Sequence, residues 1–62
     1  MTPAERAEIE EQCRVLIANF REEQAKAKQH PYGSVERAHY QALAEEQFQR
    51  AARLRDRLRG AA

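Results

Sequence analysis

The chain has 62 residues, with 11 Lys or Arg, 10 Asp or Glu and a formal net charge of +1. This length allows one small domain, whose hydrophobic core contributes only about 3 to 5 kcal/mol of stability. The charge balance differs from the strong basicity of most nucleic-acid-binding domains. The sequence has neither the ~20-residue apolar run that a membrane span requires nor a secretion leader. We therefore expect a cytoplasmic protein without membrane contact.

The first predicted helix covers residues 3–29. Thr2 is suited to the N-cap position, Pro3 fits the first helical position, and the Glu5 side chain can reach back toward the cap. Apolar residues then recur at helical spacing and form one face of the helix. They are Ile9, Cys13, Leu16, Ile17, Phe20 and Ala27. Val15 points away from this face, and Glu23 interrupts it where another apolar residue is due.

The stretch HPYGS at residues 30–34 predicts a helix stop followed by a tight turn. Pro31 disfavours helical geometry at His30, and Gly33 can adopt a positive φ. Ser34 is suited to capping a second helix, which we expect at residues 35–59. Gly60 then occupies the position where a left-handed residue commonly ends a helix.

The second predicted helix also has one apolar face. Its members are Tyr40, Leu43, Ala44, Phe48, Ala51, Leu54 and Leu58. Gln47 lies in the middle of this face, where a polar residue can fix the register or the oligomeric state. Ala38, Ala42 and Val35 form a thinner apolar strip on the opposite side.

Together these elements predict an all-α fold, an antiparallel two-helix hairpin that forms a single domain over residues 1–62. Counting outward from the turn places Phe20 near Leu43 and Ala44, Leu16 near Phe48, Cys13 near Ala51, and Ile9 near Leu54. Two amphipathic helices cover each other along one line only, so we expect hairpins to pair in a dimeric four-helix bundle or a larger homo-oligomer. A monomer and a complex with an obligate partner are the alternatives.

No constellation of residues indicates catalysis, and we expect neither an enzyme nor a cofactor. Cys13 is central in the apolar face, which favours core packing over nucleophilic chemistry. His30, His39 and Glu36 lie near one another in the sequence, but a metal centre needs a clearer third ligand. We therefore predict no catalytic residue and no metal site.

Charge is distributed unevenly along the chain. The first turns carry Glu5, Glu8, Glu10 and Glu11, whereas the last turns carry Arg50, Arg53, Arg55, Arg57 and Arg59. These ends are neighbours in an antiparallel hairpin, so one interpretation is that the acidic and basic ends pair with each other. The other is a phosphate-binding site formed by Arg50, Arg53 and Arg57, which share one flank of the helix.

Two functional hypotheses follow. The first is a small dimeric regulator or inhibitor, of the kind carried by phages and mobile elements, which docks on a larger protein. Its candidate partner-binding residues are Tyr32, His30, Val15, Val35, Ala38 and Ala42. The alternative is an RNA- or nucleotide-binding four-helix bundle that uses the arginines of the second helix.

Overall fold

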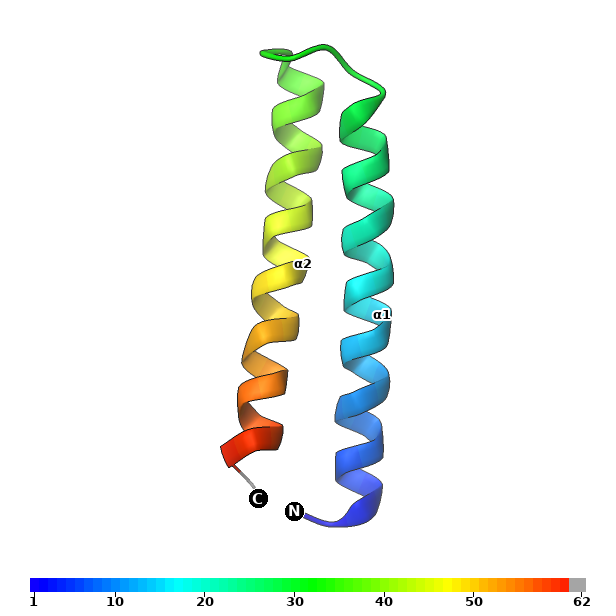
Figure 1. Cartoon of the computed structure of the whole chain (residues 1–62), viewed down its shortest axis with the longest axis vertical. Coiled ribbons are helices and arrows are strands. Elements are labelled where there is room, and N and C mark those ends of the chain that lie inside the picture. Colours follow the sequence, from blue (N-terminus) through cyan, green and yellow to red (C-terminus); the bar gives the residue numbers. More distant parts are fainter. Residues whose placement is uncertain (61–62) are drawn as a thin grey trace.

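The computed structural model describes residues 1–60 and contains two helices. Helix α1 (Pro3–Lys28) and helix α2 (Val35–Gly60) lie side by side and run in opposite directions. The turn is at one end of a rod of 45 × 15 × 10 Å, and the N-terminus and the end of α2 are at the other (Figure 1). No strand occurs in the described part of the chain. The predicted all-α helical hairpin is confirmed.

Helix α1 begins at a side-chain cap. The backbone N–H of Glu5 donates to the hydroxyl of Thr2 at 3.2 Å, and Pro3 occupies the first helical position. The Glu5 carboxylate accepts from the Thr2 hydroxyl at 3.1 Å, so it reaches the cap side chain. The helix ends at Lys28, one residue before the expected boundary, and Gln29 follows as its C-cap.

The turn is closed by local hydrogen bonds and one glycine. The N–H of Ser34 donates to the carbonyl of Pro31 at 3.2 Å, and Gly33 between them has a φ of 80°. A positive φ at this position is the feature that type II turns require, and glycine adopts it without steric cost. Ser34 then caps α2, because its hydroxyl accepts from the N–H of Arg37 at 3.2 Å.

The far end of α2 differs from the expectation for Gly60. Gly60 lies within α2, and positive φ is confined to Gly33 among the described residues. The helix therefore continues to Gly60 without the predicted left-handed stop. Glycine can adopt a helical conformation as well as a left-handed one, so a glycine at the end of a helix permits a left-handed stop but does not impose it.

The core between the helices is small. Four residues of the described chain are buried, namely Ile9, Ala27, Ala44 and Ala51. Leu16, Phe20 and Leu54 from the predicted apolar faces are only half-buried. Phe48, expected in the core, leaves 46 % of its surface exposed. Because three of the four buried residues are alanines, the helices approach closely along this line, and bulkier side chains are displaced to its two flanks.

Contacts across the hairpin define the register. The Cys13 thiol lies 3.9 Å from the carbonyl oxygen of Ala51, in agreement with the expected pairing. The Phe48 ring contacts Phe20, with 5.5 Å between ring centroids and 46° between the ring planes. The expected register places Phe48 opposite Leu16, and the contact with Phe20 lies one helical turn from that position, where a tilted aromatic pair is favourable.

Within the described residues, neither helix has a stretch that is both long and apolar enough to cross a membrane.

Candidate functional site

An open groove runs between the helices in the half of the hairpin that is distant from the turn. It has a volume of about 580 Å³. The side formed by α1 consists of Glu11, Gln12, Val15 and Leu16, and the side formed by α2 consists of Arg50, Arg53, Leu54 and Arg57. We call these eight residues the arginine groove.

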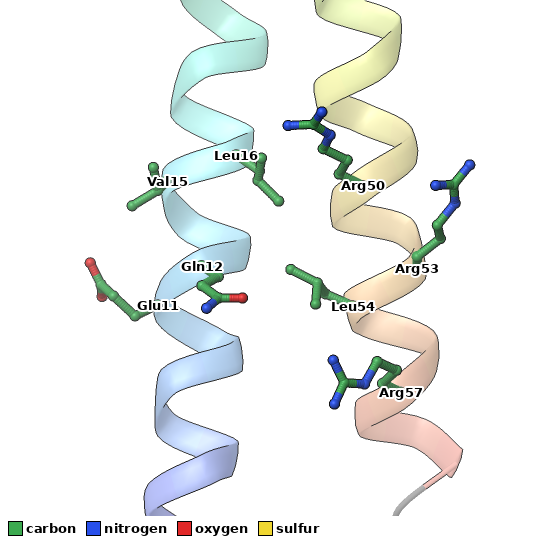
Figure 2. Close-up of a pocket in the computed structure, with 8 residues that line it drawn as sticks. All are labelled: Glu11, Gln12, Val15, Leu16, Arg50, Arg53, Leu54 and Arg57. Carbon is green, nitrogen blue, oxygen red and sulfur yellow. The ribbon is translucent and has the colours of Figure 1, made fainter.

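Apolar side chains form the floor of the arginine groove, and arginines form one edge of it. Leu16 and Leu54 project toward each other from the two helices, and Arg50 and Arg57 project from α2 above and below Leu54 (Figure 2). Val15 lies on the α1 edge and is half exposed. The groove therefore combines an apolar surface with several hydrogen-bond donors that carry positive charge.

The arginines of the groove differ in how they are paired. Arg50 forms an ion pair with Glu46, one turn earlier on α2, at 2.7 Å. Arg53 and Arg57 take part in none of the ion pairs among residues 1–60. On the α1 edge, the carboxylate of Glu11 is bound by Arg14, so it is already engaged. Of these two arginines, Arg57 projects toward the gap between the helices, whereas Arg53 projects from the side of α2 that faces away from α1 (Figure 2).

No ion pair joins the acidic and basic ends of the hairpin within residues 1–60. Each of the four ion pairs of the described residues joins two side chains of the same helix, at a spacing of three or four residues. Glu10 binds Arg6 and Glu11 binds Arg14, so these acidic side chains are engaged on α1 itself. The hydrogen bond with Glu11, followed by the attraction of its charge, raises the pKa of Arg14 above its ordinary value. Neighbours one turn away are within easy reach on a helix, which explains why local pairs form.

A second, smaller groove lies on the opposite flank of the hairpin. It is lined by Cys13, Arg14, Ile17, Ala18, Arg21 and Arg55, none of which belongs to the arginine groove. Phe48 is seven residues before Arg55 and therefore lies on nearly the same face of α2. We call Ile17 and Phe48, together with the half-buried Phe20, the phenylalanine flank.

The two histidines and two tyrosines gather around the turn. The rings of His30 and Tyr40 stack with centroids 5.6 Å apart, and His39 contacts the same tyrosine edge-on at 5.3 Å. The Lys26 ammonium lies 5.9 Å from the centre of the Tyr40 ring. His30, a predicted partner-binding residue, is thus half-buried against Tyr40.

Tyr32 is the most exposed of the large hydrophobic side chains in the described chain, at 87 %. One face of its ring is covered by Arg37, whose guanidinium carbon lies 3.8 Å from the ring centre. Arg37 also donates to the carbonyl of His30 at 3.1 Å, and its Nε is buried without a partner. Tyr32 is therefore exposed at the turn, but one face of its ring is already in contact with Arg37.

The apolar candidates for partner binding do not form one continuous surface. Val35, Ala38 and Ala42 are exposed on the first two turns of α2, beside the turn. Val15 lies instead in the arginine groove, in the other half of the hairpin. The antiparallel register explains the separation, because Cys13 is level with Ala51 and Val15 is consequently far along the rod from Val35.

The described residues contain no cluster of three or more His, Cys, Asp or Glu side chains that could hold a metal ion. His30 and His39 both contact Tyr40, but no carboxylate completes a ligand set with them. Cys13 is a free, half-buried thiol that faces the Ala51 carbonyl.

Part of the chain is similar to a known sequence motif. Residues 34–61 match the UVR motif, the UvrB/uvrC motif. The match covers a little under half of the chain and takes in Ser34 and all of α2. This motif is a small helical motif that mediates interactions with proteins and with DNA. No curated protein and no solved structure matched the chain.

The matched segment includes Phe48 and the α2 side of the arginine groove. Sequence reasoning had placed Arg50, Arg53 and Arg57 on one flank of the helix, and all three line this groove. It had treated Leu16 and Leu54 as ordinary core residues and so missed the groove floor. The available signal was the width of the apolar faces, which exceeds the single line along which two helices touch.

Proposed function

We propose that the chain is a non-enzymatic protein-binding module, a dimeric cytoplasmic hairpin that docks on a larger protein and regulates or inhibits it. The observation that carries this proposal is the arginine groove, whose apolar floor of Leu16 and Leu54 is left open by the hairpin itself. A small apolar surface with a polar edge is the usual composition of a protein interface. The similarity of residues 34–61 to a motif with protein partners supports the same function.

Dimerisation would use the phenylalanine flank. Phe48 is close to the middle of α2, and Ile17 is close to the middle of α1. A two-fold axis through the middle of the hairpin would bring the two Phe48 rings together and give an antiparallel four-helix bundle. Such pairing would cover the exposed part of Phe48, which the single hairpin leaves in water.

Sedimentation equilibrium tests the dimer. We expect the wild-type chain to sediment at twice its monomer mass of 7.2 kDa. Phe48→Arg should give a monomer, because a charge would be buried at the two-fold axis. Ala42→Arg is the matched control, since Ala42 is exposed on the outer face of α2 and should tolerate the same side chain. A wild-type chain that remains monomeric at high concentration would contradict the dimer.

Capture from a lysate tests the function as a protein-binding module. The tagged chain is incubated with nuclease-treated and untreated lysate, and retained proteins and nucleic acids are identified separately. We expect a stoichiometric protein in both samples, lost when Val15→Glu places an acidic group at the edge of the arginine groove. Val35→Glu is the control on the outer face, where 81 % of the side chain is exposed. Retention of nucleic acid alone would contradict this function.

A second candidate function is nucleic-acid binding by Arg50, Arg53 and Arg57. It is favoured by the two guanidinium groups that have no partner in the described chain, and by the similarity to a motif with DNA partners. Phosphate contacts make affinity fall steeply with salt, by roughly one power of the salt concentration per contact. A flat salt response, or full binding after Arg53→Gln and Arg57→Gln, would exclude this candidate.

A further inference from the structure

We propose that the arginine groove binds an acidic amphipathic helix of the partner protein. The inference rests on the proposed function as a protein-binding module and specifies the chemistry of the partner. Such a helix would place two apolar side chains, one turn apart, against Leu16, Leu54 and Val15. Carboxylates beside them would bind the guanidinium group of Arg57, and that of Arg53 after its side chain turns toward the groove.

The charge of the groove selects an acidic occupant. Arg53 and Arg57 have no ion-pair partner among the described residues, and the one carboxylate on the opposite edge, Glu11, is held by Arg14. A guanidinium group has a planar arrangement of donors that fits a carboxylate and can bind it through two hydrogen bonds. An acidic partner would therefore satisfy groups that the hairpin leaves unpaired.

The same charges argue against a second copy of the chain in this groove. If two arginine grooves faced each other, each copy would contribute three arginines and one glutamate that is already paired. Like charges placed face to face across an interface are destabilising. Self-association is accordingly assigned to the phenylalanine flank on the opposite side, and the arginine groove remains accessible in the dimer.

The floor of the groove selects a protein helix over nucleic acid. Leu16 and Leu54 offer apolar surface, and no aromatic side chain lines the groove on which a base could stack. Arg50 and Arg57 are seven positions apart on α2, which corresponds to about 10 Å, or two helical turns. A groove between two helices accepts the side-chain ridge of a third helix, so two turns of an amphipathic helix fit this length.

The experiment uses a designed probe, a fluorescein-labelled Ala-based peptide of roughly 16 residues, long enough to populate helix. It carries two Leu residues one turn apart and Glu at the flanking positions. Fluorescence anisotropy at low salt measures its affinity for the full chain. We expect the Glu peptide to bind at least about tenfold more tightly than the same peptide with Gln in place of Glu, because the carboxylates supply charge-assisted hydrogen bonds.

Two matched double variants locate the site. Arg53→Gln with Arg57→Gln should weaken binding of the Glu peptide by about tenfold or more, whereas Arg55→Gln with Arg59→Gln on the other flank should change it by less than about twofold. Circular dichroism verifies that each variant is helical. The reversed variant, Arg53→Glu with Arg57→Glu, should regain affinity for a peptide that carries Lys in place of Glu.

Three outcomes would overturn this inference. They are equal binding of the Glu and Gln peptides, an unchanged affinity in the Arg53 and Arg57 variant, and tighter binding of a single-stranded oligonucleotide through the same two arginines. Sedimentation of the same samples keeps the tests separate, because the Arg53 and Arg57 variants leave the phenylalanine flank unchanged. A failed peptide experiment with an intact dimer and an intact lysate capture would reject the acidic helix while retaining the protein-binding function.

Discussion

The two halves of the hairpin use their cationic side chains differently. In the turn half, Lys26 contacts Glu23 at 3.6 Å and the Tyr40 ring, and Arg37 covers Tyr32 and binds the carbonyl of His30. In the half that contains the two chain ends, which we call the terminal half, Arg53 and Arg57 have no ion-pair partner among residues 1–60. Lys26 and Arg37 of the turn half thus contact groups of the hairpin itself, whereas Arg53 and Arg57, unlike the paired Arg50, are available to another molecule.

Buried residues are shared between the halves. Ala27 and Ala44 are buried in the turn half, and Ile9 and Ala51 are buried in the terminal half. The halves differ on their flanks, because Leu16 and Leu54 line an open groove in the terminal half. We infer that both halves hold the hairpin together and that the terminal half also carries the interaction surface.

The largest expected effect comes from overfilling the turn half. Ala44→Leu inserts three carbon atoms at a position that is 4 % exposed, which should destabilise the fold by about 1 to 3 kcal/mol. Urea unfolding followed by circular dichroism at 222 nm measures the change. Ala42→Leu is the control, because Ala42 is exposed on the same helix and Leu is also a good helix former. Equal stability of the two variants would show that the helices do not approach closely at Ala44.

A somewhat smaller loss of stability is expected from substitution of Arg37, which contacts the turn. Arg37→Ala removes the hydrogen bond to His30 and the contact with Tyr32, and should cost about 1 to 2 kcal/mol. The loss is moderated because the substitution also removes the buried Nε that lacks a partner. The matched variant in the terminal half is Arg53→Ala, for which we expect a change within about 0.5 kcal/mol. Equal stability of Arg37→Ala and Arg53→Ala would contradict the proposed difference between the two halves.

Local sequence signals predicted the ends of the helices and the turn. Thr2, Ser34 and Gly33 act through their immediate neighbours, so their roles can be read from a few adjacent residues. The identity of the residues that line the groove could not be read in this way. It depends on the line of contact, where small residues such as Ala44 and Ala51 bring the helices close and displace bulky ones to the flanks.

The choice of ion-pair partners could not be predicted from the sequence either. The acidic and basic ends of the hairpin are neighbours, yet Glu10 and Glu11 bind arginines one turn away on α1. A pair within one helix forms on a backbone that is already ordered, and several such pairs compete with any contact between helices. The three arginines predicted to bind phosphate, Arg50, Arg53 and Arg57, all line one groove, but the apolar floor between the helices follows only from the structure.

The turn itself allows a third and smaller test. Gly33→Ala places a Cβ on a residue with a φ of 80°, and although nothing obstructs the added atom, the backbone conformation should cost about 1 kcal/mol. Gly60→Ala is the control in a helical conformation, where Ala is the better helix former and stability should be unchanged or slightly higher. Thermal unfolding of both variants measures the difference. A neutral Gly33→Ala would indicate that the turn rearranges easily.

The smallest expected effect reports on the arginine groove. Arg53 has like charges three residues before it and four residues after it, at Arg50 and Arg57, and its neighbour Asp56 forms no ion pair with it in the described chain. Arg53→Gln should therefore raise stability at low salt by roughly 0.2 to 0.5 kcal/mol, the usual cost of a like-charge pair at this spacing.

Arg50→Gln should act in the opposite direction, since it breaks the ion pair with Glu46 and should lower stability by a similar amount. Both changes should disappear near 1 M salt, where charges on the surface are screened. A loss of stability in Arg53→Gln would mean that this arginine contributes to the fold. The predicted gain in stability of Arg53→Gln would mean that Arg53 slightly destabilises the isolated hairpin. If the same arginine strengthens binding of the acidic peptide, its role is in the interaction and not in the fold.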